Sequence, residues 1–189
     1  ATTPSRIEGL LASTPPDAAA ALRRSYRLPS RRGALDFGGD FAFFFPAQDI
    51  AELHSRVAPT WLYRLDYAPR ALRMLGFGAT HGLDLLTVFG RTRTPLGRLM
   101  GTLGGGRALH EVSERMQRHW ARFATTGTPQ SNWTAYDEES RASMVFDDID
   151  HIEFDSRGDR RRAWDGFVHV HEWNEGGVAG RDVADESEG

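Results

Sequence analysis

The chain of 189 residues contains no cysteine and no lysine, and it has no long apolar run. The lack of cysteine excludes disulfides, thiolate chemistry and cysteine-type zinc sites, and it favours a cytoplasmic location. The most apolar segment, residues 41–45, is followed by Pro46 and falls far short of the roughly 20 residues of a membrane span. Residues 1–4 do not resemble a signal peptide. We therefore expect no membrane partner.

All positive charge comes from arginine, and the net charge is −3. A nucleic-acid-binding module normally has a basic face, so this balance argues against a nucleic-acid partner. The densest basic cluster is Arg160–Arg162, which we interpret as the solvent-exposed face of a helix.

The residue pattern predicts an α/β protein, with residues 1–173 in one domain and a disordered, acidic and glycine-rich tail over residues 174–189. A turn is expected between Gly33 and Gly39. We expect Asp40 to cap the helix that follows, Pro46 to kink or break it, and an apolar stripe from Phe41 to Leu53 to be buried. The expected helices are 3–13, 15–27, 40–57, 105–126 and 159–173, and the expected strands are 60–67, 143–146 and 152–154.

The strand predicted at 60–67 is rich in apolar and aromatic residues. A strand of this kind is normally buried between neighbours on both sides. The remaining sequence predicts few strands to pair with it, so we expect an incomplete sheet.

A histidine on a glycine-rich loop is the most informative local feature. His81 lies between Gly78 and Gly82, and the segment after it ends in Val88-Phe89-Gly90. A histidine with an ordinary pKa changes charge near neutral pH, which suits a general base. An isolated loop histidine is more often structural. The surrounding motifs therefore decide whether His81 is a general base or a structural residue.

Four motifs occur in an order that resembles the type-B carboxylesterase family, which includes the para-nitrobenzyl esterases and cholinesterases. They are the His81 segment, the strand segment Ala58–Tyr67, the helix start Gly38–Phe43, and the Trp120–Pro129 segment with Asn132–Tyr136. Thr134 replaces the proline usual in the last of these. The resemblance implies the carboxy-terminal portion of an α/β-hydrolase fold with flanking helices, and it implies that His81 is the base of a Ser-His-Glu triad.

The other parts of such a triad are missing from the sequence. No serine lies in the Gly-x-Ser-x-Gly setting that exposes a nucleophile, and Gly104–Gly106 follows the histidine rather than preceding it. Glu8 lies in a segment similar to the acid motif, but its spacing to Phe41 and His81 is too short. Asp84 matches a structural acid of the family. The resemblance therefore implies an amino-terminal partner that carries the serine, the acid and the oxyanion hole.

The resemblance also suggests residues that bind an ester substrate. Phe77 is the best candidate for an apolar pocket, with Ala42 and Phe45 on a facing helix, and core packing is an equally good interpretation of each. We expect no cofactor and no metal site, because His169 and His171 would diverge on a helix.

Two other functions stay open at this point. An esterase-like chain without a working triad would act as a binding or adhesion module, and the retained His81 loop argues against this. An independent small α/β protein is disfavoured by the missing strands.

Overall fold

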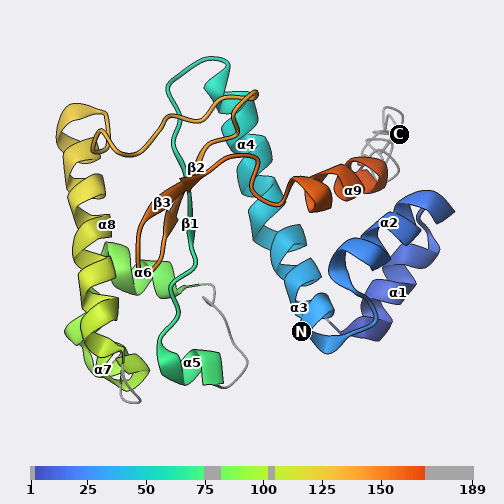
Figure 1. Ribbon diagram of the computed structural model, residues 1–189, viewed down its shortest axis with the longest axis horizontal. Coiled ribbons are helices and arrows are strands. Elements are labelled where there is room, and N and C mark those ends of the chain that lie inside the picture. The colour runs from blue at the N-terminus through green and yellow to red at the C-terminus, as the bar shows by residue number, and fades with distance from the viewer. Residues whose placement is uncertain (1–2, 75–81, 102–104, 169–189) are drawn as a thin grey trace, which may run out of the picture. The chain divides into compact units, whose positions relative to one another are not determined.

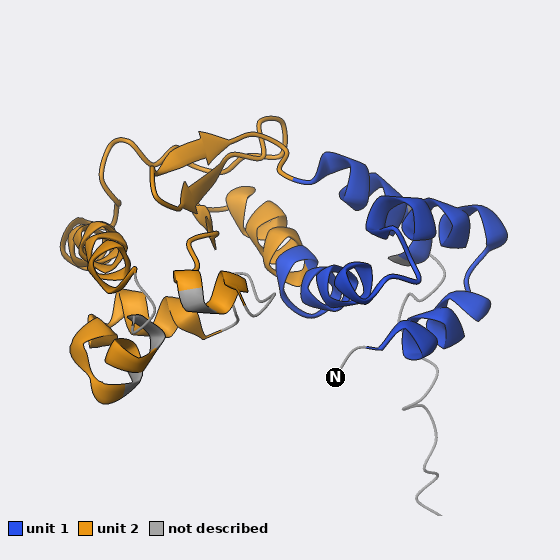
Figure 2. Ribbon diagram, turned by 60° about the horizontal axis from the view of Figure 1, so that its bottom comes forward, with its two compact units in different colours: residues 1–45, 157–189 blue, residues 46–156 orange. Residues whose placement is uncertain are grey.

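A computed structural model describes residues 3–74, 82–101 and 105–168, and it divides the chain into two compact units (Figure 2). Unit 1 comprises residues 1–45 and 157–189, and unit 2 comprises residues 46–156. Helices and a small sheet are both present, as the α/β prediction requires. The predicted tail, 174–189, lies outside the described residues, and the prediction of one domain over 1–173 stays a prediction.

Unit 1 is helical. It contains α1 (Pro4–Ala12), α2 (Pro16–Tyr26), α3 (Arg31–Gly39), the π-helix η1 (Asp40–Phe44) and α9 (Gly158–Val168). Prolines at the first turns of α1 and α2 fit these positions, because no backbone N–H is needed there. The core between the helices is aromatic and aliphatic, and its largest members are Ile7, Leu11, Leu22, Tyr26, Phe37, Phe45, Trp164 and Phe167.

The turn predicted between Gly33 and Gly39 is wrong, because this segment is the helix α3. Ser30 caps the helix: its Oγ accepts a hydrogen bond of 3.0 Å from the backbone N–H of Gly33. Gly33 is needed for packing rather than for a turn. A Cβ at this position would lie only 1.9 Å from the carbonyl oxygen of Tyr26, so α3 can begin this close to the end of α2 only with glycine there.

The helix is not broken at Pro46, and the backbone widens just before it. After α3 the chain continues through η1 into α4 (Phe45–Ser55), and the N–H of Phe45 bonds to the carbonyl of Asp40, five residues back. The widened turn relieves the clash that a proline ring makes with the carbonyl four residues before it. Asp40 is therefore inside a continuous helical segment, and the prediction that it caps one is wrong.

The predicted apolar stripe is only partly buried. Phe45 is in the core of unit 1, whereas Phe41 is half exposed and stacks on Trp164 at 5.6 Å between ring centroids. In unit 2, Ile50 and Leu53 on α4 are 68% and 61% exposed. Helical spacing alone therefore does not say which residues of an apolar stripe will be covered.

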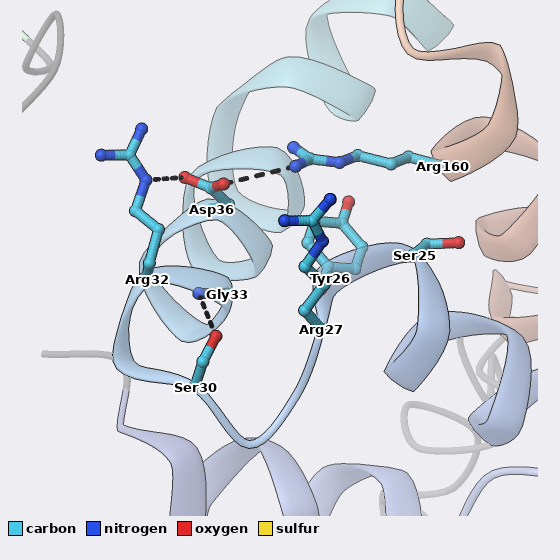
Figure 3. Close-up of a pocket in the computed structure, with 8 residues that line it drawn as sticks. All are labelled: Ser25, Tyr26, Arg27, Ser30, Arg32, Gly33, Asp36 and Arg160. Atoms are coloured by element: carbon cyan, nitrogen blue, oxygen red, sulfur yellow. Dashed lines mark hydrogen bonds and ion pairs between the residues drawn. The ribbon is translucent and has the colours of Figure 1, made fainter.

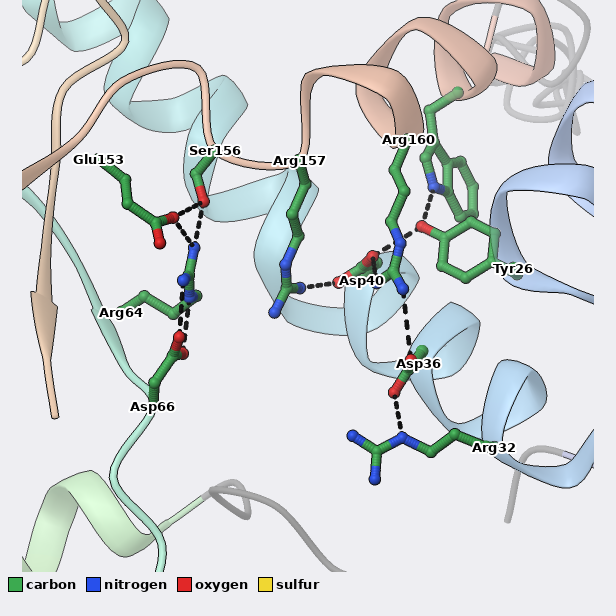
Figure 4. A network of polar contacts seen from close by, with 11 residues as sticks. Tyr26, Arg32, Asp36, Asp40, Arg64, Asp66, Glu153, Ser156, Arg157 and Arg160 are labelled. Carbon is green, nitrogen blue, oxygen red and sulfur yellow. Dashed lines mark hydrogen bonds and ion pairs between the residues drawn. The ribbon is translucent and has the colours of Figure 1, made fainter.

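A buried carboxylate joins the helices of unit 1. Asp40 is 1% exposed and accepts hydrogen bonds from Tyr26 at 2.7 Å, from Arg160 at 3.0 Å and from Arg157 (Figure 4). Trp164 Nε1 donates to the Tyr26 hydroxyl at 2.7 Å. The interpretation of Arg160–Arg162 as an exposed face is therefore wrong for Arg160.

Unit 2 is built on a three-stranded sheet in the order β1-β2-β3, with β1 at Leu62–Leu65, β2 at Ser143–Phe146 and β3 at His151–Glu153. β1 and β2 are parallel, with Leu62 opposite Ser143, and β2 and β3 are antiparallel (Figure 1). Every residue of β2 is buried, whereas β1 is half-buried throughout. The three strands confirm the predicted strand positions, although β1 is shorter than predicted.

The helix α8 (Gly106–Thr126) confirms the strongest helical prediction. Leu109, Val112 and Met116 on its buried face pack with Trp133, Met144 and Phe146. Gly127, with φ 76°, ends the helix. Four short helices were not predicted: α5 (Arg70–Met74), α6 (Leu83–Val88), the 3-10 helix η2 (Arg91–Arg93) and α7 (Pro95–Gly101).

Candidate functional site

The predicted catalytic histidine, His81, and the predicted pocket residue Phe77 lie outside the described residues, in the segment 75–81. The structure describes what precedes and follows this segment. Before it, β1 leads through Tyr67 to α5, and after it, α6 begins at Leu83. Gly82 has φ 95°, a conformation that favours glycine. The residue next to His81 therefore has a defined backbone conformation.

Helix α6 is attached to β1 through one polar contact. The Tyr63 hydroxyl on β1 donates to Asp84 Oδ2 at 3.2 Å, and the backbone N–H of Leu85 donates to Asp84 Oδ1 at 2.9 Å. Burial, together with the charge of Asp84, raises the pKa of Tyr63 to about 12, so the hydroxyl keeps its proton at neutral pH. Both oxygens of Asp84 therefore accept hydrogen bonds, one from a side chain of β1 and one from the backbone of α6, as expected for a structural acid.

Helix α6 is attached to α8 as well. Leu83 is buried in the core of unit 2, and the Ser113 hydroxyl donates to the carbonyl of Thr87 at 2.6 Å. Ser113 and Thr87 are both fully buried. The start of α6 is consequently held through Leu83 and Asp84, and its end is held through Thr87.

The strand motif Tyr63-Arg64-Leu65-Asp66 carries an ion-pair network (Figure 4). The Arg64 guanidinium donates to both oxygens of Asp66 at 2.6 Å, and it pairs with Glu153 on β3 at 3.0 Å. Burial opposes ionisation of Glu153, but hydrogen bonds from Ser156 and Arg64 prevail and lower the pKa of Glu153 to about 2. The motif thus ties the ends of β1 and β3 together, which spacing alone did not predict.

The two predicted pocket residues that the structure describes belong to unit 1. Ala42 is exposed on η1. Phe45 is 8% exposed and packs on Trp164, with 5.5 Å between ring centroids, and on Phe44. These contacts describe core packing for Phe45. Its role and that of Ala42 in a substrate pocket stay predictions.

The carboxylate of Glu8, considered above as a triad acid, is bound by an arginine. Arg23 donates to Glu8 Oε2 from Nε at 3.1 Å and from a terminal nitrogen at 2.7 Å. The hydrogen bonds from Arg23 lower the pKa of Glu8. Glu8 lies on α1, and its carboxylate joins this helix to α2 through Arg23.

Within the described ranges, no cluster of three or more histidine, aspartate or glutamate side chains has the arrangement of a metal site. His169 and His171 lie outside those ranges. None of the helices in the described part of the chain has the length and apolarity required to span a bilayer.

Comparison with known proteins identifies the motifs. The model of the carboxylesterase family matches residues 19–159, which include the His81 segment and the three strands of the described residues. The chain belongs to the carboxylesterase family. The resemblance inferred from the ordered motifs is thereby confirmed.

Among relatives of this carboxylesterase-family chain, the para-nitrobenzyl esterase of Bacillus subtilis (strain 168) is 34% identical over 131 residues, covering 65% of this chain and 25% of that protein. Mouse carboxylesterase 1F is 30% identical over 120 residues, covering 58% of this chain and 20% of that protein. The chain therefore spans about a quarter or less of the length of these relatives.

Solved structures agree with this assignment. A PNB esterase matches with a TM-score of 0.63 and 30% identity over 76% of this chain and 32% of its own. A Geobacillus stearothermophilus carboxylesterase matches with a TM-score of 0.64 and 25% identity over 77% of this chain and 31% of its own. The fold prediction is confirmed: the small sheet and its helices form part of an α/β-hydrolase fold.

Proposed function

We propose that this chain is the part of a serine carboxylesterase that supplies the triad histidine, His81, and one side of the substrate pocket. An amino-terminal part of the same enzyme would supply the serine, the acid and the oxyanion hole. The family match over residues 19–159 carries the proposal, because it includes the His81 segment with its glycine and Val-Phe-Gly neighbours. The para-nitrobenzyl esterase name of one relative supports a small ester as substrate.

In the proposed reaction, the His81 imidazole takes the proton of the serine hydroxyl as the serine attacks the ester carbonyl. It then returns the proton to the leaving alcohol, and an acyl-enzyme remains to be hydrolysed by water. The acid would hold the ring in the correct tautomer, and backbone N–H groups would bind the oxyanion. This chain's described residues would position the base through the Tyr63–Asp84 contact and the buried Leu83.

The sheet supports the proposal of an amino-terminal part. Within residues 3–74, 82–101 and 105–168, β1 pairs with β2 and with no other strand. The carbonyl of Leu62 accepts a hydrogen bond from the Trp133 indole at 3.1 Å, but β1 remains an edge strand. Unpaired strand edges favour addition of a further strand, which the longer relatives have the length to provide.

The test is hydrolysis of para-nitrophenyl acetate and butyrate by the complete assembly, in which this chain is expressed with an amino-terminal part of a related esterase carrying Gly-x-Ser-x-Gly. We expect His81→Ala to lower kcat/KM by about four orders of magnitude. His151→Ala is the matched control, because that imidazole is exposed at the start of β3 and should leave the rate unchanged. A fluorophosphonate probe should label the partner's serine in the control and much more slowly in His81→Ala.

Two results would overturn the proposal. Equal hydrolysis by His81→Ala and the control would remove the histidine from the mechanism. An assembly that forms but neither hydrolyses esters nor reacts with the probe would favour the alternative of a non-catalytic binding module.

A further inference from the structure

A pocket of about 340 Å³ lies within unit 1, at the place where α2 ends and α3 begins (Figure 3). Three of the side chains that line it are arginines from three different elements. Arg27 follows α2, Arg32 is in the first turn of α3, and Arg160 is on α9. Asp36 contributes the one carboxylate of the lining, so the charged side chains of the pocket sum to +2.

The surroundings reinforce this positive charge. The described residues of unit 1, 3–45 and 157–168, carry ten arginines and six acidic residues, a net charge of +4. Residues 46–156 carry twelve arginines and fourteen acidic residues. The basic pocket therefore lies in the basic part of a chain whose total charge is −3.

The internal carboxylates do not use all the donors of the three arginines. Asp36 is shared between Arg32 at 3.2 Å and Arg160 at 3.3 Å, which approach it from opposite sides (Figure 3). Each guanidinium has five N–H donors, so donors remain on both. The Arg27 side chain has no hydrogen bond or ion pair with any part of the chain that the structure describes.

Arg160 is held in position before any ligand binds. Its guanidinium lies 4.6 Å from the centre of the Tyr26 ring and donates to the buried Asp40 at 3.0 Å. A donor group that is already ordered loses little conformational entropy on binding. The Ser30 hydroxyl is also partly committed: it accepts the Gly33 N–H, so its own proton is available to a ligand oxygen.

The start of α3 favours negative charge here. The first turn of α3 begins at the pocket, and Ser30 Oγ already accepts its Gly33 N–H. In the last turn of α2, the carbonyls of Arg23 and Arg24 accept from the backbone N–H groups of Leu28 and Arg27. The partial positive charge of α3 adds to that of the arginines.

We infer that this pocket binds the phosphate group of a small phosphorylated molecule. A phosphate monoester has a charge close to −2 and three terminal oxygens, which match the pocket's charge of +2 and its three arginines. A carboxylate offers one charge and a single fork of oxygens, so it would leave part of the site unpaired. The site lies in unit 1 and does not depend on the proposed esterase function.

The experiment is isothermal titration calorimetry of the 189-residue chain with inorganic phosphate and with phenyl phosphate, at constant ionic strength because screening weakens such binding. Benzoate serves as the monoanionic comparison. We expect saturable binding of one phosphate per chain, with benzoate at least about tenfold weaker.

Variants locate the site. Arg27→Asn removes the unpaired guanidinium and is compatible with the positive φ of 52° at this position, and Arg32→Gln removes a second one without changing the core. Each should weaken phosphate binding about tenfold. Arg31→Gln is the matched control. Arg31 is also exposed at the start of α3 but does not line the pocket, so the affinity of this variant for phosphate should be unchanged. Circular dichroism checks that each variant is folded.

The inference would be overturned by the absence of saturable binding, by equal affinities for benzoate and phenyl phosphate, or by an effect of Arg31→Gln as large as that of Arg27→Asn. The last result would mean that phosphate is attracted by the net positive charge of unit 1 and not bound by the pocket. If Arg27→Asn does not fold, Arg32→Gln and Arg31→Gln still decide the question.

Discussion

The two units of this chain are stabilised in different ways. Unit 1 surrounds a buried carboxylate, Asp40, with two arginines, a tyrosine hydroxyl and an aromatic cluster around Trp164. Unit 2 has an apolar core between α8 and the sheet, in which Trp133 and Phe146 contact one another at 5.6 Å between ring centroids. Asp66 and Glu153, which pair with Arg64 in unit 2, are 35% and 36% exposed, whereas Asp40 in unit 1 is 1% exposed. A mutation that removes a charge should therefore affect unit 1 most, and one that removes apolar volume should affect unit 2 most.

The largest effect is expected for Asp40→Ala. This change leaves the Arg157 and Arg160 guanidinium groups without their buried partner, and breaking one side of such a pair costs about 3–5 kcal/mol. Urea unfolding measures the change, and hydrogen exchange should show faster exchange in α2 and α9 but not in α8. Asp165→Ala, on the exposed side of α9, is the control and should have little effect. A small change in Asp40→Ala would mean that the network does not stabilise unit 1.

The corresponding change in unit 2 is Met144→Ala. Met144 is 1% exposed at the centre of β2, and truncation of a buried methionine to alanine costs about 2–5 kcal/mol. Hydrogen exchange should accelerate in α8 and the sheet rather than in α2. If both variants accelerate exchange throughout the chain, the units do not unfold separately and the comparison fails.

A smaller effect is expected from the ion pair at the edge of the unit 2 sheet. The pKa of Glu153 is lowered to about 2 in the folded chain, from 4.5, so the stability that it contributes is present above pH 4.5 and is lost as the pH falls towards 2. The side chain is 36% exposed, and solvent screening limits the contribution to about 1–2 kcal/mol. Urea midpoints measured from pH 6 to pH 2.5 should fall less steeply for Glu153→Gln. Parallel curves would contradict the prediction.

The weakest expected effect is a pH response of the unit 2 core. Burial lowers the pKa of His119, and Arg118 acts in the same direction, whereas Asp150 opposes both. Because the folded pKa lies below the unfolded value of 6.5, stability is complete above pH 6.5 and decreases as the pH falls below it. His119→Phe should remove this loss between pH 7 and pH 5.5 in thermal unfolding. His54→Phe, an exposed histidine, should keep it.

The regular parts of the fold could be predicted from sequence because their signals are local. Leu109, Val112 and Met116 on α8 recur at helical spacing, and β2 is a compact apolar segment. Asp40 could not be predicted in this way, because its partners Arg157 and Arg160 are more than a hundred residues away in the sequence. The residues that neighbour Asp40 in the sequence do not distinguish a buried acid from a helix cap.

In the candidate site too, features that depend on local sequence could be predicted, and features that depend on distant contacts could not. The motif around His81 predicts the family, which the comparison confirms, because neighbouring residues of fixed type carry it. The short helix α6 was missed because contacts with Tyr63 and Ser113, distant in sequence, stabilise it. The arginine pocket was missed for a similar reason: Arg27 and Arg160 are brought to one place only by the folding of α9 against α2.

The π-helical turn η1 holds one residue more than a turn of α-helix. In a regular α-helix, residues five apart point in directions about 140° from one another, so Asp40 and Phe45 would not both face the core of unit 1. The extra residue brings Phe45 to within about 40° of Asp40, the angle expected for a separation of four. Deleting one residue from 41–44 would therefore leave Phe45 facing the core, because a regular α-helix gives residues four apart the same angle of about 40°.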